Sequence, residues 1–110
     1  MIEKTLCELK DLSEGQALGF DPHQQGRDSM FVVKVDGEIR AYRNRCPHQQ
    51  AHLEYRKDRF LSADRRQIVC HAHNARFEPE SGLCVSGPCR GKFLEPIAVK
   101  VEGGMLVLVD

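Results

Sequence analysis

The chain has 110 residues, a formal net charge of zero at pH 7 and a hydrophobic fraction of 41%. This composition suits a single domain over residues 1–110 with one modest core, and the zero net charge argues against a nucleic-acid binder. No run approaches the roughly 18–20 consecutive apolar residues of a membrane span, and no signal-peptide pattern opens the chain, so we expect a cytoplasmic protein without a membrane anchor. In that compartment the five cysteines favour metal ligands or free thiols over a disulfide framework.

Short runs of β-prone residues alternate with turn residues along the chain. They predict three hairpins, whose strands span residues 31–35 and 38–42, 67–69 and 75–77, and 97–101 and 105–109. The first turn is Asp36-Gly37, the dipeptide best suited to a type I′ turn, and the last is Gly103-Gly104. The one helix signal is a turn around residues 11–14, where Ser or Asp could cap. We therefore expect an all-β sandwich or barrel.

Two Cys/His pairs stand at the predicted strand ends. The first is Cys46-Pro47-His48 and the second is Cys70-His71-Ala72-His73, with 21 residues between His48 and Cys70. Each pair supplies one thiolate and one imidazole from a loop, and a sheet can bring two such loops together. Two cysteines and two histidines suit either zinc or an iron–sulfur cluster. A C2H2 finger would place both cysteines on one loop and both histidines on one helix, so a structural zinc protein is the less favoured alternative.

The order C-x-H followed by C-x-x-H resembles the Rieske family, in which two cysteines bind one iron of a [2Fe–2S] cluster and two histidines bind the other. The resemblance implies that Cys46 and Cys70 bind one iron and that His48 and His73 bind the other. It favours His73 over His71 as the second histidine ligand. It also implies a Rieske-type fold of stacked antiparallel sheets, with a cluster-binding subdomain made of two hairpin loops.

The resemblance extends through most of the chain, with two departures. Residues 82–88 look like the family's third loop, whose Gly-Pro covers the cluster. Family members usually carry Gly where this chain has Asn74, the non-glycine residue that best tolerates a left-handed backbone. The connection between the two motifs is somewhat long, so we expect a small extra loop within residues 53–66.

The remaining histidines and cysteines have ordinary interpretations. His23 and His52 are expected to face solvent, and Cys7 to be a half-buried strand residue. Cys84 and Cys89 flank the third loop, and in a reducing cytosol free thiols are favoured over a disulfide between them.

Positions next to the second motif indicate the kind of Rieske protein. High-potential relatives carry Ser and Tyr where this chain has Ala75 and Phe77, and a cysteine in each cluster loop where it has Ala51 and Ala72. The chain therefore resembles the low-potential soluble group, such as the ferredoxin components of bacterial aromatic-ring dioxygenases.

That resemblance implies a one-electron carrier between a reductase and a terminal oxygenase or reductase. The alternative is a small Rieske subunit of a nitrite-reductase-like or oxygenase complex. No length is left for a mononuclear iron domain, so we expect no catalytic residues and no turnover by the chain alone.

Positive charge is concentrated in the middle of the chain, where residues 40–66 include eight basic and three acidic residues. Most such runs are simply solvated surface. The other interpretation is a surface that steers an acidic redox partner toward the cluster loops.

Overall fold

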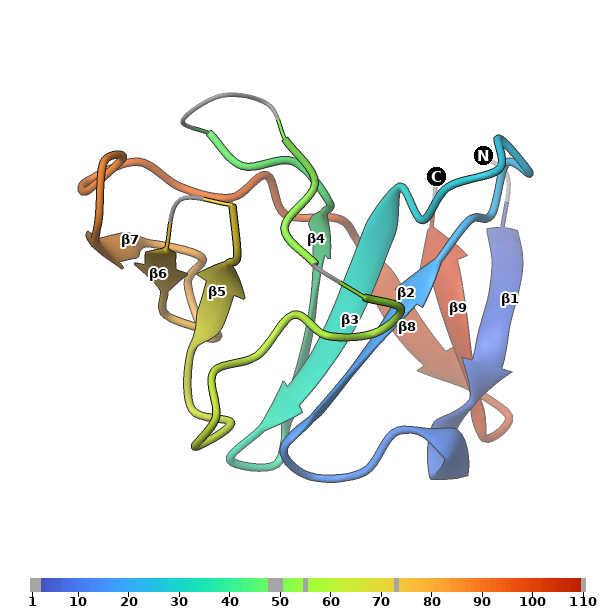
Figure 1. Cartoon of the computed structure of the whole chain (residues 1–110). Coiled ribbons are helices and arrows are strands. Elements are labelled where there is room, and N and C mark those ends of the chain that lie inside the picture. Colours follow the sequence, from blue (N-terminus) through green and yellow to red (C-terminus); the bar gives the residue numbers. More distant parts are fainter. Residues whose placement is uncertain (1–2, 48–50, 55, 73, 110) are drawn as a thin grey trace.

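The computed structural model describes residues 3–47, 51–54, 56–72 and 74–109. Its strands form three antiparallel sheets of three strands each, set side by side (Figure 1). The central sheet has the order β2-β3-β4, formed by Gln16–Phe20, Met30–Val35 and Glu38–Arg43. On one side lies the sheet β1-β9-β8, formed by Glu3–Glu8, Met105–Val109 and Val99–Glu102. On the other lies the sheet β5-β6-β7, formed by Ile68–Cys70, Ala75–Phe77 and Cys84–Ser86. The prediction of an all-β fold of antiparallel sheets is confirmed.

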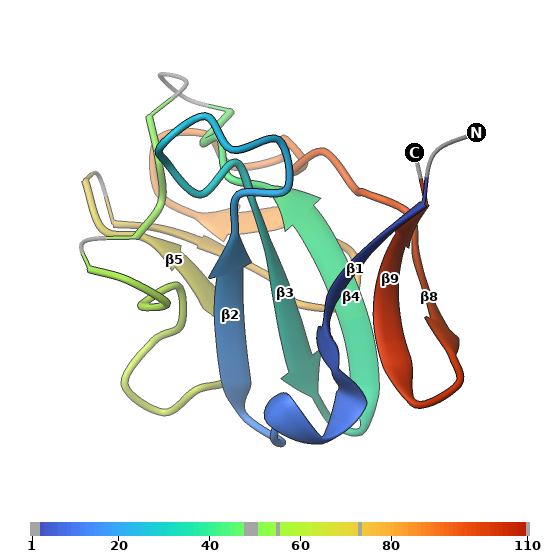
Figure 2. The same ribbon diagram turned by 90° about the vertical axis from the view of Figure 1, so that its right-hand side faces the viewer.

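Strand β3 is buried on both faces, which explains its unbroken apolar run. Successive side chains of a strand point to opposite faces. Phe31 and Val33 accordingly belong to the core shared with the β5-β6-β7 sheet. Met30 and Val32 belong to a second core shared with Leu106 and its neighbours in β9. The central sheet thus lies between two hydrophobic clusters; the turned view in Figure 2 shows the other two sheets on either side of it.

The predicted β3–β4 hairpin is confirmed, and its turn has the expected geometry. Asp36 and Gly37 have φ values of 56° and 76°, as a type I′ turn requires. The Glu14 carboxylate accepts hydrogen bonds from both of their backbone N–H groups, at 2.6 and 2.8 Å. The turn is therefore held by a side chain from the β1–β2 connection.

The C-terminal hairpin is shorter than predicted. Its strand β8 begins at Val99 rather than residue 97, because the preceding backbone is hydrogen-bonded to β4. Ile97 N–H donates to Ala41 at 2.9 Å, and Arg43 N–H donates to Glu95 at 2.9 Å. This segment links the cluster side of the molecule to the last sheet.

The expected turn at residues 11–14 lies earlier. A 3-10 helix, η1, spans Leu9–Asp11, and the Asp11 carboxylate accepts a hydrogen bond from Glu8 N–H at 3.2 Å. Leu12 is 2% exposed and belongs to the second core, so the chain leaves the helix there to bury that side chain. In the part of the chain that the structure describes, no helix is long and apolar enough to cross a membrane.

Candidate metal centre

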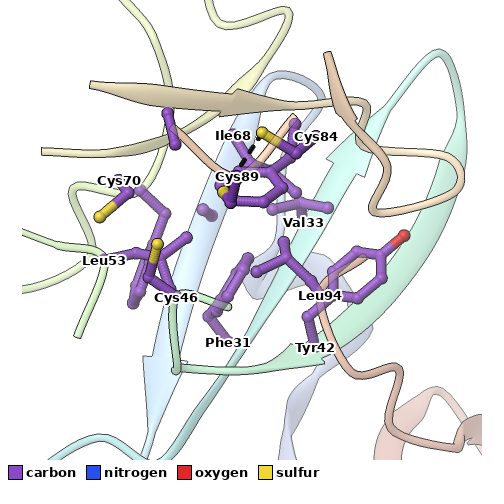
Figure 3. Packing of buried hydrophobic residues seen from close by; sticks show 14 residues of the cluster. Phe31, Val33, Tyr42, Cys46, Leu53, Ile68, Cys70, Cys84, Cys89 and Leu94 are labelled. Atoms are coloured by element: carbon purple, nitrogen blue, oxygen red, sulfur yellow. Dashed lines mark hydrogen bonds between the residues drawn. The ribbon is translucent and has the colours of Figure 1, made fainter. Parts of the chain in front are cut away.

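The two cysteines of the predicted ligand set lie together in the core. Cys46 follows β4 and Cys70 ends β5; both are fully buried, and neither forms a disulfide. They belong to the same hydrophobic cluster as Leu53 and Ile68. Figure 3 shows their two sulfur atoms on the same side of that cluster. Two soft thiol donors in a fully buried site fit the cysteine side of an iron–sulfur centre.

Backbone hydrogen bonds close each loop and join the two. In the first loop, Cys46 N–H donates to the Ala51 carbonyl at 2.7 Å. In the second loop, Asn74 N–H donates to the Cys70 carbonyl at 2.7 Å. His71 N–H donates to Leu53 at 3.0 Å, across the two loops. Asn74 has a φ of 59°, which confirms that it adopts the left-handed backbone expected of a residue in place of glycine.

His48 and His73, the predicted histidine ligands, lie outside the described residues. Within the described ranges no group of three or more His, Cys, Asp or Glu side chains gathers as a metal site. His71 is half-buried, with its Nδ1 3.3 Å from the Leu53 carbonyl oxygen. One ring nitrogen of His71 therefore contacts the first loop.

The third loop packs closely on the second cluster hairpin. Gly87 has a φ of 102°, and a Cβ built there would lie 2.8 Å from the Cα of Ala75. Only glycine allows this approach without a shift of the backbone. The turn between β6 and β7, which leads into this loop, is held where the Tyr42 hydroxyl donates to the Pro79 carbonyl at 2.7 Å.

The other cysteines and histidines lie mostly as expected. Cys84 and Cys89 are free thiols with their sulfurs 3.3 Å apart. Burial, together with the hydrogen bond to Cys84, raises the pKa of Cys89 to about 12, so its thiol stays protonated at neutral pH. Cys7 is half-buried in β1, and His23 is exposed, as predicted. His52 is half-buried rather than solvent-facing, and it directly precedes Leu53, which is fully buried in the core.

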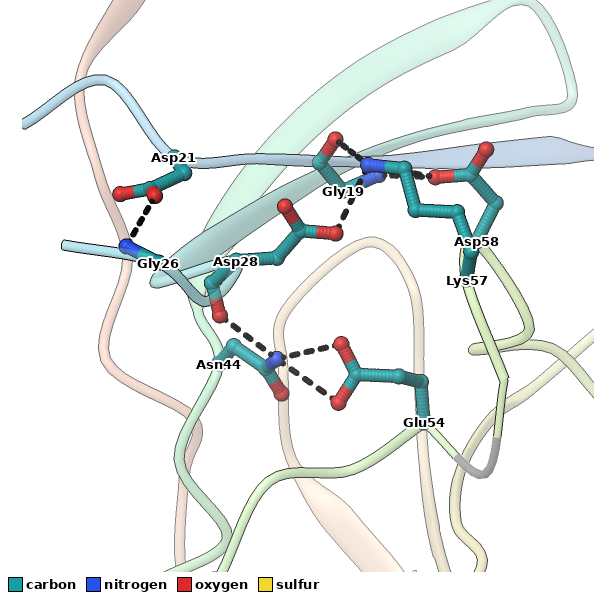
Figure 4. A network of polar contacts seen from close by, with 8 residues as sticks. All are labelled: Gly19, Asp21, Gly26, Asp28, Asn44, Glu54, Lys57 and Asp58. Carbon is teal, nitrogen blue, oxygen red and sulfur yellow. Dashed lines mark hydrogen bonds and ion pairs between the residues drawn. The ribbon is translucent and has the colours of Figure 1, made fainter. Parts of the chain in front are cut away.

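Sequence analysis missed the role of Asn44, which is 4% exposed and joins both ends of the first loop (Figure 4). Its Oδ1 accepts a hydrogen bond from Leu53 N–H at 2.8 Å. Its Nδ2 donates to the Asp28 carbonyl at 3.0 Å and lies 2.9 and 2.8 Å from the two Glu54 carboxylate oxygens. No local pattern signals this role, because the nearest of these partners is nine residues away.

A second polar contact ties the segment after the first loop to β2. Lys57 Nζ donates to the Gly19 carbonyl and to Asp28, both at 2.8 Å, while Asp58 accepts Gly19 N–H at 2.7 Å (Figure 4). Burial alone would lower the pKa of Lys57, but the hydrogen bond and charge of Asp28, with the charge of Asp58, raise it. The segment is therefore anchored by a cation that stays charged.

Comparison with known proteins gives a consistent picture. The model of the Rieske [2Fe-2S] domain family matches residues 3–107. The chain is 30% identical over 103 residues to the ferredoxin component of the alkene monooxygenase system of Xanthobacter autotrophicus, covering 94% of this chain and 77% of that protein. It is 32% identical over 88 residues to the ferredoxin component of a 2,4-dinitrotoluene dioxygenase system from a Burkholderia species, covering 80% of this chain and 79% of that protein.

Solved structures show the same fold at lower identity. The ferredoxin of carbazole 1,9a-dioxygenase from Nocardioides aromaticivorans superposes with a TM-score of 0.74 at 24% identity, covering 99% of this chain and 98% of that chain. A Sphingomonas yanoikuyae ferredoxin gives a TM-score of 0.72 at 22% identity, covering 99% of each chain.

Proposed function

Because the chain belongs to the Rieske [2Fe–2S] domain family, we propose that it is a one-electron carrier whose cluster is bound by Cys46, Cys70, His48 and His73. Cys46 and Cys70 bind one iron, and His48 and His73 bind the other. The observation that supports this assignment best is the pair of fully buried cysteines, Cys46 and Cys70, which form no disulfide and are held on two loops that are hydrogen-bonded to each other.

The residues around the site exclude water and hold the loops. When bound, the cluster would supply one-electron redox chemistry. Phe77 and Ala75 line the same core as the two cysteines and carry no hydroxyl that could donate a hydrogen bond to a sulfur. Such hydrogen bonds stabilise the reduced cluster. We therefore assign a midpoint potential near the lower end of the Rieske range of roughly −150 to +300 mV.

The proposed partners are a reductase and a terminal oxygenase or reductase. Both curated relatives are named as ferredoxin components of oxygenase systems, and the chain covers more than three quarters of each. This supports a separate carrier rather than a small subunit fixed in a nitrite-reductase-like or oxygenase complex. We further propose that residues 1–110 form a single domain and that the protein works in the cytoplasm.

Metal analysis and absorption spectroscopy test the cluster directly. The purified protein should be red-brown, with about two irons and two sulfides per chain. His73→Ala should abolish or alter the visible spectrum, and the matched variant His71→Ala should leave it almost intact. A colourless protein with stoichiometric zinc that cannot be loaded with iron and sulfide would contradict the proposal. A spectrum lost in His71→Ala but kept in His73→Ala would contradict the ligand assignment.

A further inference from the structure

A hollow lined by basic side chains lies against the second cluster loop. It has a volume of about 620 Å³ and includes Arg59, Arg65 and Arg76, with His71 and Asn74 at its cluster end. Arg59 and Arg65 are exposed and Arg76 is half-buried. No acidic side chain lines it among the described residues. We refer to it below as the arginine hollow.

The charges of the arginine hollow are only partly balanced by neighbouring carboxylates. Among the described residues, the hydrogen bonds of Arg65 and Arg76 are long and go to neutral partners, the Gly15 carbonyl at 3.5 Å and the Gln67 side chain at 3.4 Å. Within the described ranges, none of the three arginines forms an ion pair, whereas Arg40 and Arg43 pair with Glu38 and Glu95 at 3.0 and 2.6 Å. The basic residues of the segment 40–66 therefore differ in their surroundings. Arg40 and Arg43 are paired with surface carboxylates, and in the described part of the chain the three arginines of the hollow are not.

One carboxylate lies close to the arginine hollow. Asp64 accepts hydrogen bonds from the Ser62 hydroxyl at 2.6 Å and from Arg66 N–H at 3.1 Å. The Ser62 bond, the Arg66 bond and the charges of Arg66 and Arg76 lower its pKa, so it remains ionised. Asp64 is one charge against the three that line the hollow, and its oxygens are already engaged.

The position of the hollow relates it to electron transfer. Arg76 lies in β6, directly opposite Val69 of β5 in the hairpin that carries the second cluster loop. Arg59 and Arg65 come from the segment between the two loops, which the Lys57 contacts anchor to β2. A molecule seated in the hollow therefore touches the cluster loop itself.

We propose that the arginine hollow is the docking surface for an acidic face of the redox partner protein, an inference that rests on the proposed electron-carrier function. Guanidinium groups match carboxylates in a planar, two-point geometry. Electron-transfer encounters are brief and favour small interfaces that are steered by charge. Two of its three arginines are exposed, and exposed cations suit a protein surface better than a small anion.

Electron transfer to two small oxidants of opposite charge tests whether the electrostatic potential at the arginine hollow is positive. In each case the reduced protein gives one electron to the metal of the oxidant, and no bond or proton changes place. Oxidation by hexacyanoferrate(III), an anion, should slow about three- to tenfold at low salt in the double variant Arg59→Gln with Arg65→Gln. Oxidation by hexaammineruthenium(III), a cation, should not slow. Raising the ionic strength should remove the difference.

A control variant removes a positive charge far from the site. Lys10 lies in η1, on the opposite side of the molecule from β5 and β6 (Figure 1). Lys10→Gln should leave the rates of oxidation by both oxidants unchanged. Equal rates for wild type and the double variant with both oxidants would overturn the inference while the protein remains red-brown. A colourless protein would instead overturn the proposed function.

Binding of an acidic peptide separates a protein-docking surface from a small-anion site. Fluorescence anisotropy of labelled decaglutamate should report binding to the wild type and a loss of at least about tenfold in affinity in the double variant. Inorganic phosphate at the same ionic strength should not displace the peptide. No measurable binding, or full displacement by phosphate, would overturn the docking proposal.

Discussion

The side chain of Asn44 offers the sharpest test of how the first cluster loop is held. Asn44 lies at the start of that loop, and its side chain hydrogen-bonds to Leu53 and Glu54 at the end of the loop. It also donates to the Asp28 carbonyl. Asn44→Ala leaves the buried N–H of Leu53 without its acceptor and removes the donor that faces Glu54. A buried polar group left unpaired costs about 1–3 kcal/mol, and we expect a total loss of about 2–4 kcal/mol once the cavity is included.

Asn44→Asp separates the effect of charge from the effect of shape. The variant keeps an oxygen for Leu53 N–H but places a carboxylate where Nδ2 now lies 2.8–2.9 Å from the Glu54 oxygens. Two like charges at 4 Å repel by about 4 kcal/mol at an effective dielectric constant of 20. Because Glu54 is only half-buried, solvent screens part of this, and we expect a cost of about 2–4 kcal/mol.

The double variant Asn44→Asp with Glu54→Gln exchanges the two groups, so that an amide at position 54 faces a carboxylate at position 44. A hydrogen-bond donor then again faces an acceptor. The double variant should recover the part of the lost stability that the charge repulsion causes, whereas the hydrogen bond to the Asp28 carbonyl stays lost; Glu54→Gln alone should cost about 1 kcal/mol of stability. Urea titration of the iron-loaded protein checks this, with visible bleaching reporting on the loops and circular dichroism on the fold. A cost of 2–4 kcal/mol corresponds to a midpoint lower by about 1–2 M urea. Equal midpoints for Asn44→Asp and the double variant would refute the account, because the charge clash would then not explain the loss.

Three further changes test the packing and tuning of the site. Phe77→Tyr, alone or with Ala75→Ser, should raise the midpoint potential by on the order of 40–90 mV, the equivalent of 1–2 kcal/mol of hydrogen bonding to the reduced cluster; voltammetry showing no rise would count against the low-potential assignment. Gly87→Ala should lower the free energy of unfolding by about 1–3 kcal/mol more than Gly91→Ala does. Both glycines have positive φ, but only a Cβ at Gly87 would clash with a neighbour. Equal melting temperatures for the two variants would disprove this. Phe60→Ala, which removes a fully buried ring, should cost about 3–5 kcal/mol in a denaturation experiment, and a loss below about 1 kcal/mol would show that the ring is not part of the core.

Much of the fold could be predicted because its signals are local. The Asp36-Gly37 turn needs positive φ at both residues, a requirement that only a few dipeptides meet cheaply, and the structure has it. The run from Met30 to Val33 is apolar throughout because the strand is buried on both faces. The spacing within each Cys/His motif is equally local, so the candidate ligand set could be proposed from the sequence, although His48 and His73 lie outside the described residues.

The errors arose where a contact distant in sequence overrode local preference. The last hairpin starts two residues late because the chain first pairs with β4 through Ile97. The helical turn ends early because Leu12 is needed in the second core.

The sequence by itself determined the β-class of the fold, the hairpin turns and the candidate ligands of the centre, since each depends on residues within a few positions of one another. Only the tertiary structure decided which polar groups support the site. Asn44 meets partners nine, ten and sixteen residues away, and Arg76 joins Arg59 and Arg65 only because β6 folds back beside the segment between the loops. Hydrogen bonds and charges act through space, and the distances that govern them are set when the sheets pack.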